Sequence, residues 1–105
     1  MKSAIDTDLI SIFTPKPQHF EAFVAAQIEN LPRLGSLSQS RGARFYVAKD
    51  GRHAVLVSFF EDEAAVQEFR QSDAFREHRD RLQSLLQSSE SGFYTLAYAR
   101  DAELA

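Results

Sequence analysis

His78 is the side chain of this sequence best suited to proton transfer. Histidine changes its charge near neutral pH, so it can take a proton from a substrate under ordinary conditions. The spacing of apolar residues around it predicts one face of a helix, formed by Phe75, His78, Leu82 and Leu85. We therefore expect His78 to act as a general base. The alternative is a half-buried histidine that caps a pocket or bonds a backbone carbonyl.

A second group of residues could bind a substrate. Leu56, Ser58 and Phe60 share one side of a predicted strand, because side chains alternate along a strand. Apolar faces of the predicted helices add further candidates, namely Phe23, Val66 and Phe75. Such a pocket would take a small hydrophobic or aromatic ligand. Plain core packing is the alternative, since nine phenylalanines without a tryptophan also fill a small core.

Several kinds of chemistry are absent from the sequence. The chain has no cysteine, which excludes disulfides, thiolate metal sites and a cysteine nucleophile. It also has no histidine and carboxylate spacing of a zinc site, no glycine-rich phosphate loop and no nucleophile elbow. We therefore expect no metal site built from these side chains.

The composition is that of one small folded domain. With 105 residues, 44% hydrophobic and 26% charged, the chain predicts a single domain over 1–105 with a core at about 8–99. A net charge of -3 without a clustered basic face argues against nucleic-acid binding. The longest apolar run, 54–60, is far shorter than the roughly 18 residues of a membrane span. No signal peptide is recognisable in 1–8, so we expect a cytoplasmic protein that binds no membrane.

Hydrophobic periodicity and turn residues predict the elements that position these side chains. Pro32 is expected to end the first helix, Asp50-Gly51 to form a hairpin turn, and 88–92 to form a second turn. The expected elements, in order, are strand 8–14, helix 17–31, strands 43–48 and 54–60, helices 62–70 and 73–86, and strand 93–99. The tail 100–105 is too polar to place.

This order predicts an α+β fold of the ferredoxin-like βαββαβ type with a four-stranded antiparallel sheet. Helices cover one face of such a sheet. The other face would carry apolar side chains, chiefly from 54–60 and 93–99. An uncovered apolar face of this extent favours association, so we expect a homodimer through the open sheet face.

Four segments resemble the antibiotic biosynthesis monooxygenase family, whose members are dimeric α+β barrels. They are 43–51, 54–65, 72–79 and 94–98. The resemblance implies a pocket between helices and sheet, and cofactor-independent oxidation of a small aromatic, anthrone-like or quinol-like compound with O2. Anthrone oxygenases often carry Asn and Trp at the positions of Leu56 and Phe60, so these two polar groups are missing here.

Two other functions stay open at this point. Haem-degrading relatives carry an Asn on the first strand, a Trp at the position of Phe60 and a histidine ligand one position after His78, so haem cleavage is disfavoured. The pocket could instead hold haem or another hydrophobic ligand without turnover. The domain could also be a non-catalytic dimeric module, in which case Phe23, Phe60 and Phe75 would fill the space around His78.

Overall fold

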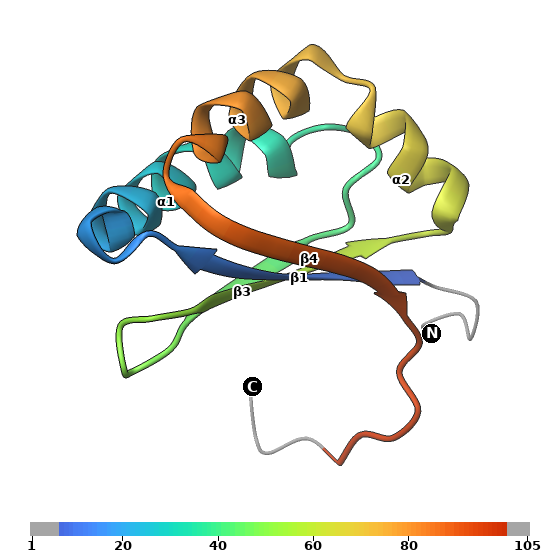
Figure 1. The fold of residues 1–105 in the computed structure, drawn as a ribbon. Helices are drawn as coiled ribbons and strands as arrows, with labels where there is room; N and C mark the ends of the chain where they lie inside the picture. Colours follow the sequence, from blue (N-terminus) through green and yellow to red (C-terminus); the bar gives the residue numbers. More distant parts are fainter. Residues whose placement is uncertain (1–6, 101–105) are drawn as a thin grey trace.

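The computed structural model describes residues 7–100, so 1–6 and 101–105 of the predicted domain, with nearly all of the tail, lie outside the described part. Strands, helices and one short 3-10 helix alternate along this part of the chain (Figure 1). They are β1 (Thr7–Pro15), η1 (Pro17–His19), α1 (Phe20–Gly35), β2 (Ala43–Val47), β3 (Ala54–Phe60), α2 (Glu63–Arg70), α3 (Asp73–Gln83) and β4 (Leu86–Tyr94).

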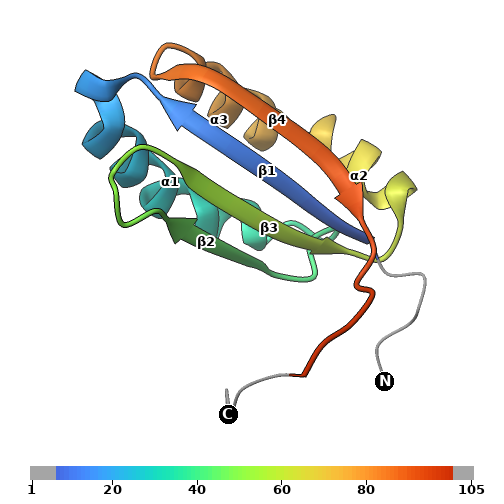
Figure 2. The ribbon, with the colours of Figure 1, turned by 60° about the horizontal axis from the view of Figure 1, so that its bottom comes forward.

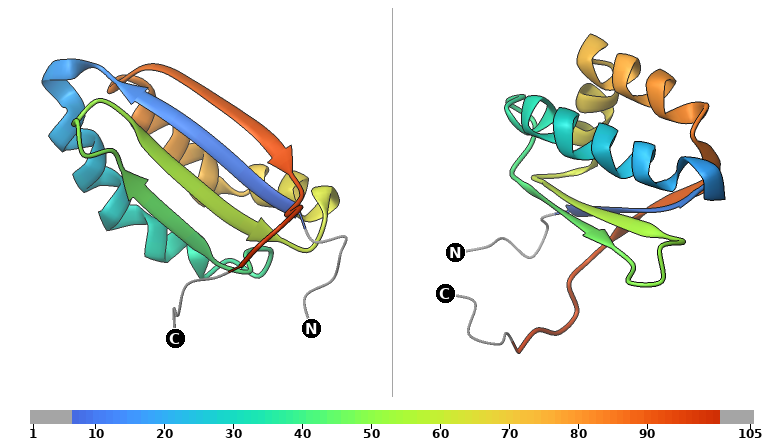
Figure 3. Two further views of the ribbon diagram at one scale, coloured as in Figure 1. Left: turned by 90° about the horizontal axis from the view of Figure 1, so that it is seen from below. Right: turned by 90° about the vertical axis from the view of Figure 1, so that its left-hand side faces the viewer.

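The strands form one antiparallel sheet in the order β2-β3-β1-β4 (Figure 2). All three α-helices of the described part lie on the same side of the sheet, and none of them covers its other face, called the bare face below (Figure 3). The α+β fold of the ferredoxin-like type is thus confirmed. Two layers enclose one interior, between the helices and the covered face of the sheet.

Alternation along the central strands decides which side chains face the helices. On β1, Leu9 and Ser11 are buried under the helices, while Ile12 points to the bare face and is 39% exposed. On β3, Ala54 and Phe60 are buried on the helix side. Val57, between them in the opposite phase, pairs with Ile10 on the bare face.

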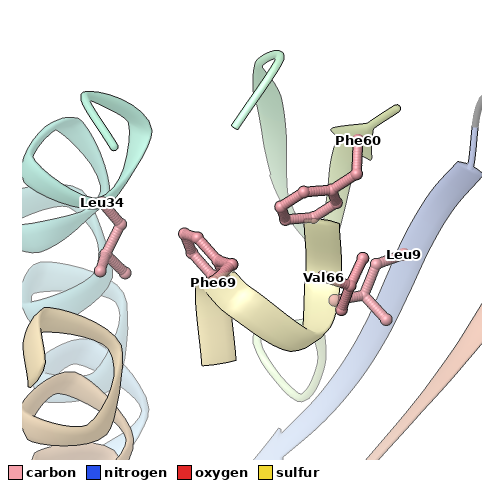
Figure 4. Packing of buried hydrophobic residues seen from close by; sticks show 5 residues of the cluster. All are labelled: Leu9, Leu34, Phe60, Val66 and Phe69. Carbon is pink, nitrogen blue, oxygen red and sulfur yellow. The ribbon is translucent and has the colours of Figure 1, made fainter. Parts of the chain in front are cut away.

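Two apolar clusters fill the interior. The first consists of Leu9, Leu34, Phe60, Val66 and Phe69, drawn in Figure 4, and the second of Phe23, Ala54 and Leu82. The ring of Phe23 is fully buried and lies 5.1 Å from the Phe13 ring and 6.3 Å from the Phe45 ring, measured between centroids. Offset aromatic contacts of this kind add to the stabilisation from apolar burial.

Local signals account for several element boundaries. The Asp62 carboxylate accepts a hydrogen bond from the Ala65 N–H at 2.9 Å and caps α2, and the Ser72 hydroxyl accepts one from the Phe75 N–H at 3.1 Å and caps α3. The Asp50-Gly51 turn is present as predicted. Gly51 has φ +72°, a conformation that glycine adopts without steric cost.

The prediction that Pro32 ends the first helix is wrong. Helix α1 continues to Gly35 with Pro32 inside it. Leu31 packs against the core and Leu34 is buried within it, so the turn containing Pro32 is held by burial on both sides of the proline. Tertiary packing here outweighs the loss of one backbone hydrogen bond.

The last strand is also displaced from its predicted place. Residues 88–92, expected as a turn, lie inside β4, and 95–99, expected as strand, lie beyond it. β4 pairs with β1 over the register Asp8↔Tyr94 to Thr14↔Ser88. Serine and glycine alone do not favour a strand. The long pairing with β1 stabilises β4 through backbone hydrogen bonds. The apolar side chains of the bare face come mainly from β3 and β1, and Tyr94, opposite Asp8, is the residue of 93–99 that the strand register places on this face.

Candidate active site

A cavity of about 430 Å³ lies between the helices and the covered face of the sheet. Its floor comes from β1, β3 and β4 with the first residue of β2, and its roof from α1, α3 and the end of α2. The wall includes the neighbouring rings of Phe60, Phe69 and Phe75, whose successive centroids are 5.2 Å and 5.3 Å apart. The interior around His78 is therefore open, and the aromatic wall leaves room for a flat ligand.

The structure brings most of the predicted site residues together. Leu56, Ser58, Phe60, Phe75 and His78 all line the cavity, although they come from β3 and α3. Two predicted substrate-binding residues lie elsewhere: Phe23 and Val66 are fully buried in the core clusters and are absent from the cavity wall.

Gln27 is a site residue that the sequence reasoning missed. It is fully buried on α1, and its Oε1 lies 2.6 Å from Nε2 of His78 on α3. The side-chain oxygen of glutamine only accepts, so Nε2 of His78 carries the hydrogen and donates it. A signal was present, because Gln27 follows Phe23 by four residues and thus falls on the apolar stripe of its helix.

The same hydrogen bond leaves the second imidazole nitrogen free. In the neutral tautomer fixed by Gln27, Nδ1 of His78 is an acceptor, and no group in residues 7–100 bonds to it. Burial lowers the pKa of His78 below its usual value of 6.5, and the positive charges of Arg81 and Arg33 lower this pKa further. His78 is therefore neutral at pH 7 and can accept a proton at Nδ1.

Serine hydroxyls form the polar part of the floor. Ser11 of β1 and Ser91 of β4 bond to each other through their Oγ atoms at 2.8 Å, and Ser58 and Ser89 also line the cavity. Sequence reasoning selected only Ser58 among them. The alternation of Ser11 with Leu9 and Phe13 could have placed it on the same face, whereas Ser89 and Ser91 were assigned to a turn.

The described residues were also compared with the requirements of a metal site and of a membrane-spanning helix. Within residues 7–100, no group of three or more His, Cys, Asp or Glu side chains is placed to hold a metal ion. In the same part of the chain, no helix is both long enough and apolar enough to cross a lipid bilayer.

The structure is thus a small α+β domain of the ferredoxin-like class. Its helices and sheet enclose a cavity whose wall includes the buried His78. The sequence profile described as antibiotic biosynthesis monooxygenase matches residues 10–81, so the chain belongs to that family. No curated protein matches the chain.

Solved structures share the fold over nearly the whole chain. Rv0793 from Mycobacterium tuberculosis is 23% identical, with a TM-score of 0.74 over 92% of this chain and 98% of that chain. The protein SO0527 from Shewanella oneidensis is 22% identical, with a TM-score of 0.79 over 90% and 93%. SnoaB from Streptomyces nogalater, a cofactor-independent oxygenase, is 19% identical, with a TM-score of 0.73 over 91% and 97%.

The lowered pKa of His78 has a measurable consequence for stability. The unfolded chain takes up a proton near pH 6.5, whereas folded His78 stays neutral to lower pH. The contribution of His78 to the free energy of unfolding is thus fully present above pH 6.5 and falls as the pH drops toward the folded pKa. An NMR titration of the His78 ring should give a midpoint below 6.5, and His78→Gln should remove this part of the pH dependence. A midpoint at or above the usual value would contradict the buried neutral tautomer.

Proposed function

We propose that this protein is a monooxygenase that oxidises a small aromatic, anthrone-like or quinol-like compound with O2, without a metal or flavin held by the protein. The observation that carries this proposal is a buried histidine, His78, on the wall of an aromatic cavity, with an Nδ1 atom that has no hydrogen-bond partner within residues 7–100. Membership of the antibiotic biosynthesis monooxygenase family supports it. So does the shared fold of SnoaB, a cofactor-independent oxygenase.

The chemistry follows from one proton transfer. His78 Nδ1 takes a proton from an acidic C–H or O–H of the bound ring system, and the resulting electron-rich anion passes an electron to O2. For an anthrone, the CH2 group becomes a carbonyl: two hydrogens leave the carbon, one oxygen atom of O2 enters, and the other leaves as water. The protein supplies the base, the position of the ring and shelter from bulk water.

The direct experiment is to follow oxygen uptake and quinone absorbance when the purified protein meets an anthrone or a hydroquinone in air. Rates above the buffer blank are expected for at least one of them, because the free base and the ring pocket act together. Calorimetry on the same compounds separates the rival function: binding without oxygen uptake would identify a protein that holds hydrophobic ligands without turnover. Rates equal to the blank for every compound would remove the oxidation proposal.

We further propose that two copies associate through the bare face of the sheet. The chain belongs to the antibiotic biosynthesis monooxygenase family, and the resemblance to that family implies a dimer. The face presents Ile10 and Ile12 from β1 beside Val55 and Val57 from β3, with Tyr46 of β2 51% exposed at its margin. A second copy of the same face would remove this apolar surface from water, around a two-fold axis.

The substitution Val57→Glu should break this association. A carboxylate at the centre of the paired sheets would be buried without a partner, so we expect the dimer to weaken by at least about 100-fold. Light scattering coupled to size exclusion should show a fall from twice the 11.9 kDa chain mass to once that mass. Ala25→Glu, on the exposed side of α1, is the matched control. A monomeric wild type, or a dimer that survives Val57→Glu, would rule out this face.

A further inference from the structure

The cavity carries a charge opposite in sign to that of the whole chain. The sequence holds 15 acidic and 12 basic residues, a net charge of -3. Yet the residues that line the cavity include Arg70 and Arg79 and neither Asp nor Glu. The charged groups of the cavity are thus both positive, which is an environment that favours an anionic ligand.

Both arginines belong to helices that lie above the edge strand β4. Arg79 belongs to α3, and Arg70 is in the last turn of α2, the two helices drawn above β4 in Figure 1. The Arg70 guanidinium lies 6.0 Å from the centre of the Phe93 ring of β4, which holds it beside the sheet. The wall residues Ser89 and Ser91 of β4 are exposed, so the cavity is open to solvent along this side.

The existing contacts leave the arginine charges available. Among residues 7–100, Arg79 is paired only with its neighbour Asp80, at 3.5 Å between Nη2 and Oδ1, and its side chain is 51% exposed. An exposed pair at this distance contributes little and is easily exchanged for a better partner. Arg70 has a ring contact but no ion pair within the described residues.

The inner wall of the cavity is apolar, in contrast to the side that carries the two arginines. Phe60, Phe69 and Phe75 form a continuous aromatic surface, of which Phe60 and Phe69 appear as sticks in Figure 4. A ligand that fits the whole cavity must therefore be amphipathic. Its rings would lie against the phenylalanines, and its charge would remain at the arginine-lined opening.

We propose that the substrate is an aromatic carboxylate whose ring system enters the cavity while its carboxylate is held at the opening by Arg79 and Arg70. The planar guanidinium group matches a carboxylate with two parallel hydrogen bonds, which makes arginine the residue of choice for this recognition. The inference rests on the proposed function in taking this cavity as the substrate site, and it adds the chemical class of the substrate.

The experiment compares two fully oxidised probes, an anthraquinone carboxylate and the matched hydroxymethyl anthraquinone, by calorimetry at low and physiological ionic strength. Neither probe needs turnover to bind. We expect the carboxylate to bind about tenfold more tightly, with an advantage that shrinks as salt is added. Arg70→Gln combined with Arg79→Gln should remove the advantage and leave the affinity for the neutral probe unchanged. Arg76→Gln, an exposed arginine of α3 paired with Asp73 at 2.7 Å and absent from the cavity wall, should keep it.

Three outcomes would overturn this inference: equal affinities for the two probes, an advantage that survives the double substitution, or no binding of either probe. An equal loss for both probes in the double variant would also overturn it, because the arginines would then support the cavity and not the carboxylate. The proposed function fails separately. A carboxylate advantage without oxygen uptake on any compound leaves this inference standing and removes the oxidation, whereas uptake without the advantage does the reverse.

Discussion

Replacing His78 with alanine is expected to lower kcat/KM for aromatic oxidation by about 10²–10⁴-fold, the usual contribution of a positioned general base. The reason lies in the geometry of the wild-type site. Gln27 occupies Nε2 at 2.6 Å, so Nδ1 alone is free to take the substrate proton. Oxygen uptake under saturating and limiting substrate gives kcat and KM separately, and the loss should fall mainly on kcat.

A pH profile makes this prediction sharper. In the wild type, kcat/KM should rise with pH through the folded pKa of His78, which lies below 6.5, and should be level by neutral pH if no other group titrates. His78→Ala should lose that rise. His53→Ala removes an exposed histidine beside the hairpin turn and serves as the matched control, with wild-type kinetics expected. Wild-type rates in His78→Ala, with its fold checked by circular dichroism, would show that another group is the base.

Phe23→Ala is expected to cost about 3–5 kcal/mol of the free energy of unfolding, the range for removing a buried aromatic ring. Phe23 is fully buried, and its ring contacts Phe13 of β1 and Phe45 of β2 from α1. The substitution therefore opens a void where the helix meets two strands. Domains of this size hold only about 5–15 kcal/mol in total, so much of the margin would be lost.

Urea unfolding at one fixed protein concentration measures this loss, because association would otherwise change the apparent stability. Phe20→Ala is the matched control. Phe20 begins the same helix, is only half-buried, and belongs to neither buried cluster, so its loss should be clearly smaller. Equal losses for the two variants would mean that the Phe23 ring is not a central packing element.

Elements with strong local signals could be predicted from the sequence. The bounds of β3, Ala54–Phe60, follow from an apolar run that only Ser58 interrupts, and Gly51 marks the hairpin turn before it. Asp62 and Ser72 are N-caps of helices, and aspartate and serine are residue types that are preferred at this position. In each case the determining interactions lie within a few residues of one another, so no knowledge of the tertiary structure is needed.

The two misplaced boundaries depend on distant partners. Pro32 interrupts a helical pattern by its own chemistry, yet Leu34 beyond it finds a buried position that only the assembled core provides. β4 has weak strand propensity over its serines, but β1 offers a complete row of backbone partners. Propensity describes a segment alone, whereas these segments are held by contacts across the sequence.

The candidate site divides in the same way. His78 and the helix-facing residues of β3 could be selected by residue type and alternation, and the structure places them around one cavity. Gln27 was not selected, because its importance comes from a bond to a residue 51 positions away. Arg79 was not selected either, because its residue type and spacing do not distinguish it from the other charged residues of its helix. Its place on the cavity wall appears only when α3 is set over the sheet.

The serine-rich strand β4 also bears on how copies of the chain can assemble. Its outer edge is unpaired in the sheet, and a strand edge of nine residues is a template for adding further strands without limit. On β4, Ser88 and Glu90 lie on the same side of the sheet as the apolar patch of β1 and β3. Pairing this polar edge with the edge of another copy would therefore gain little free energy. In the proposed dimer, by contrast, a single partner subunit covers the whole apolar face. The sequence of β4 thus favours a closed pair of subunits over an open-ended fibre.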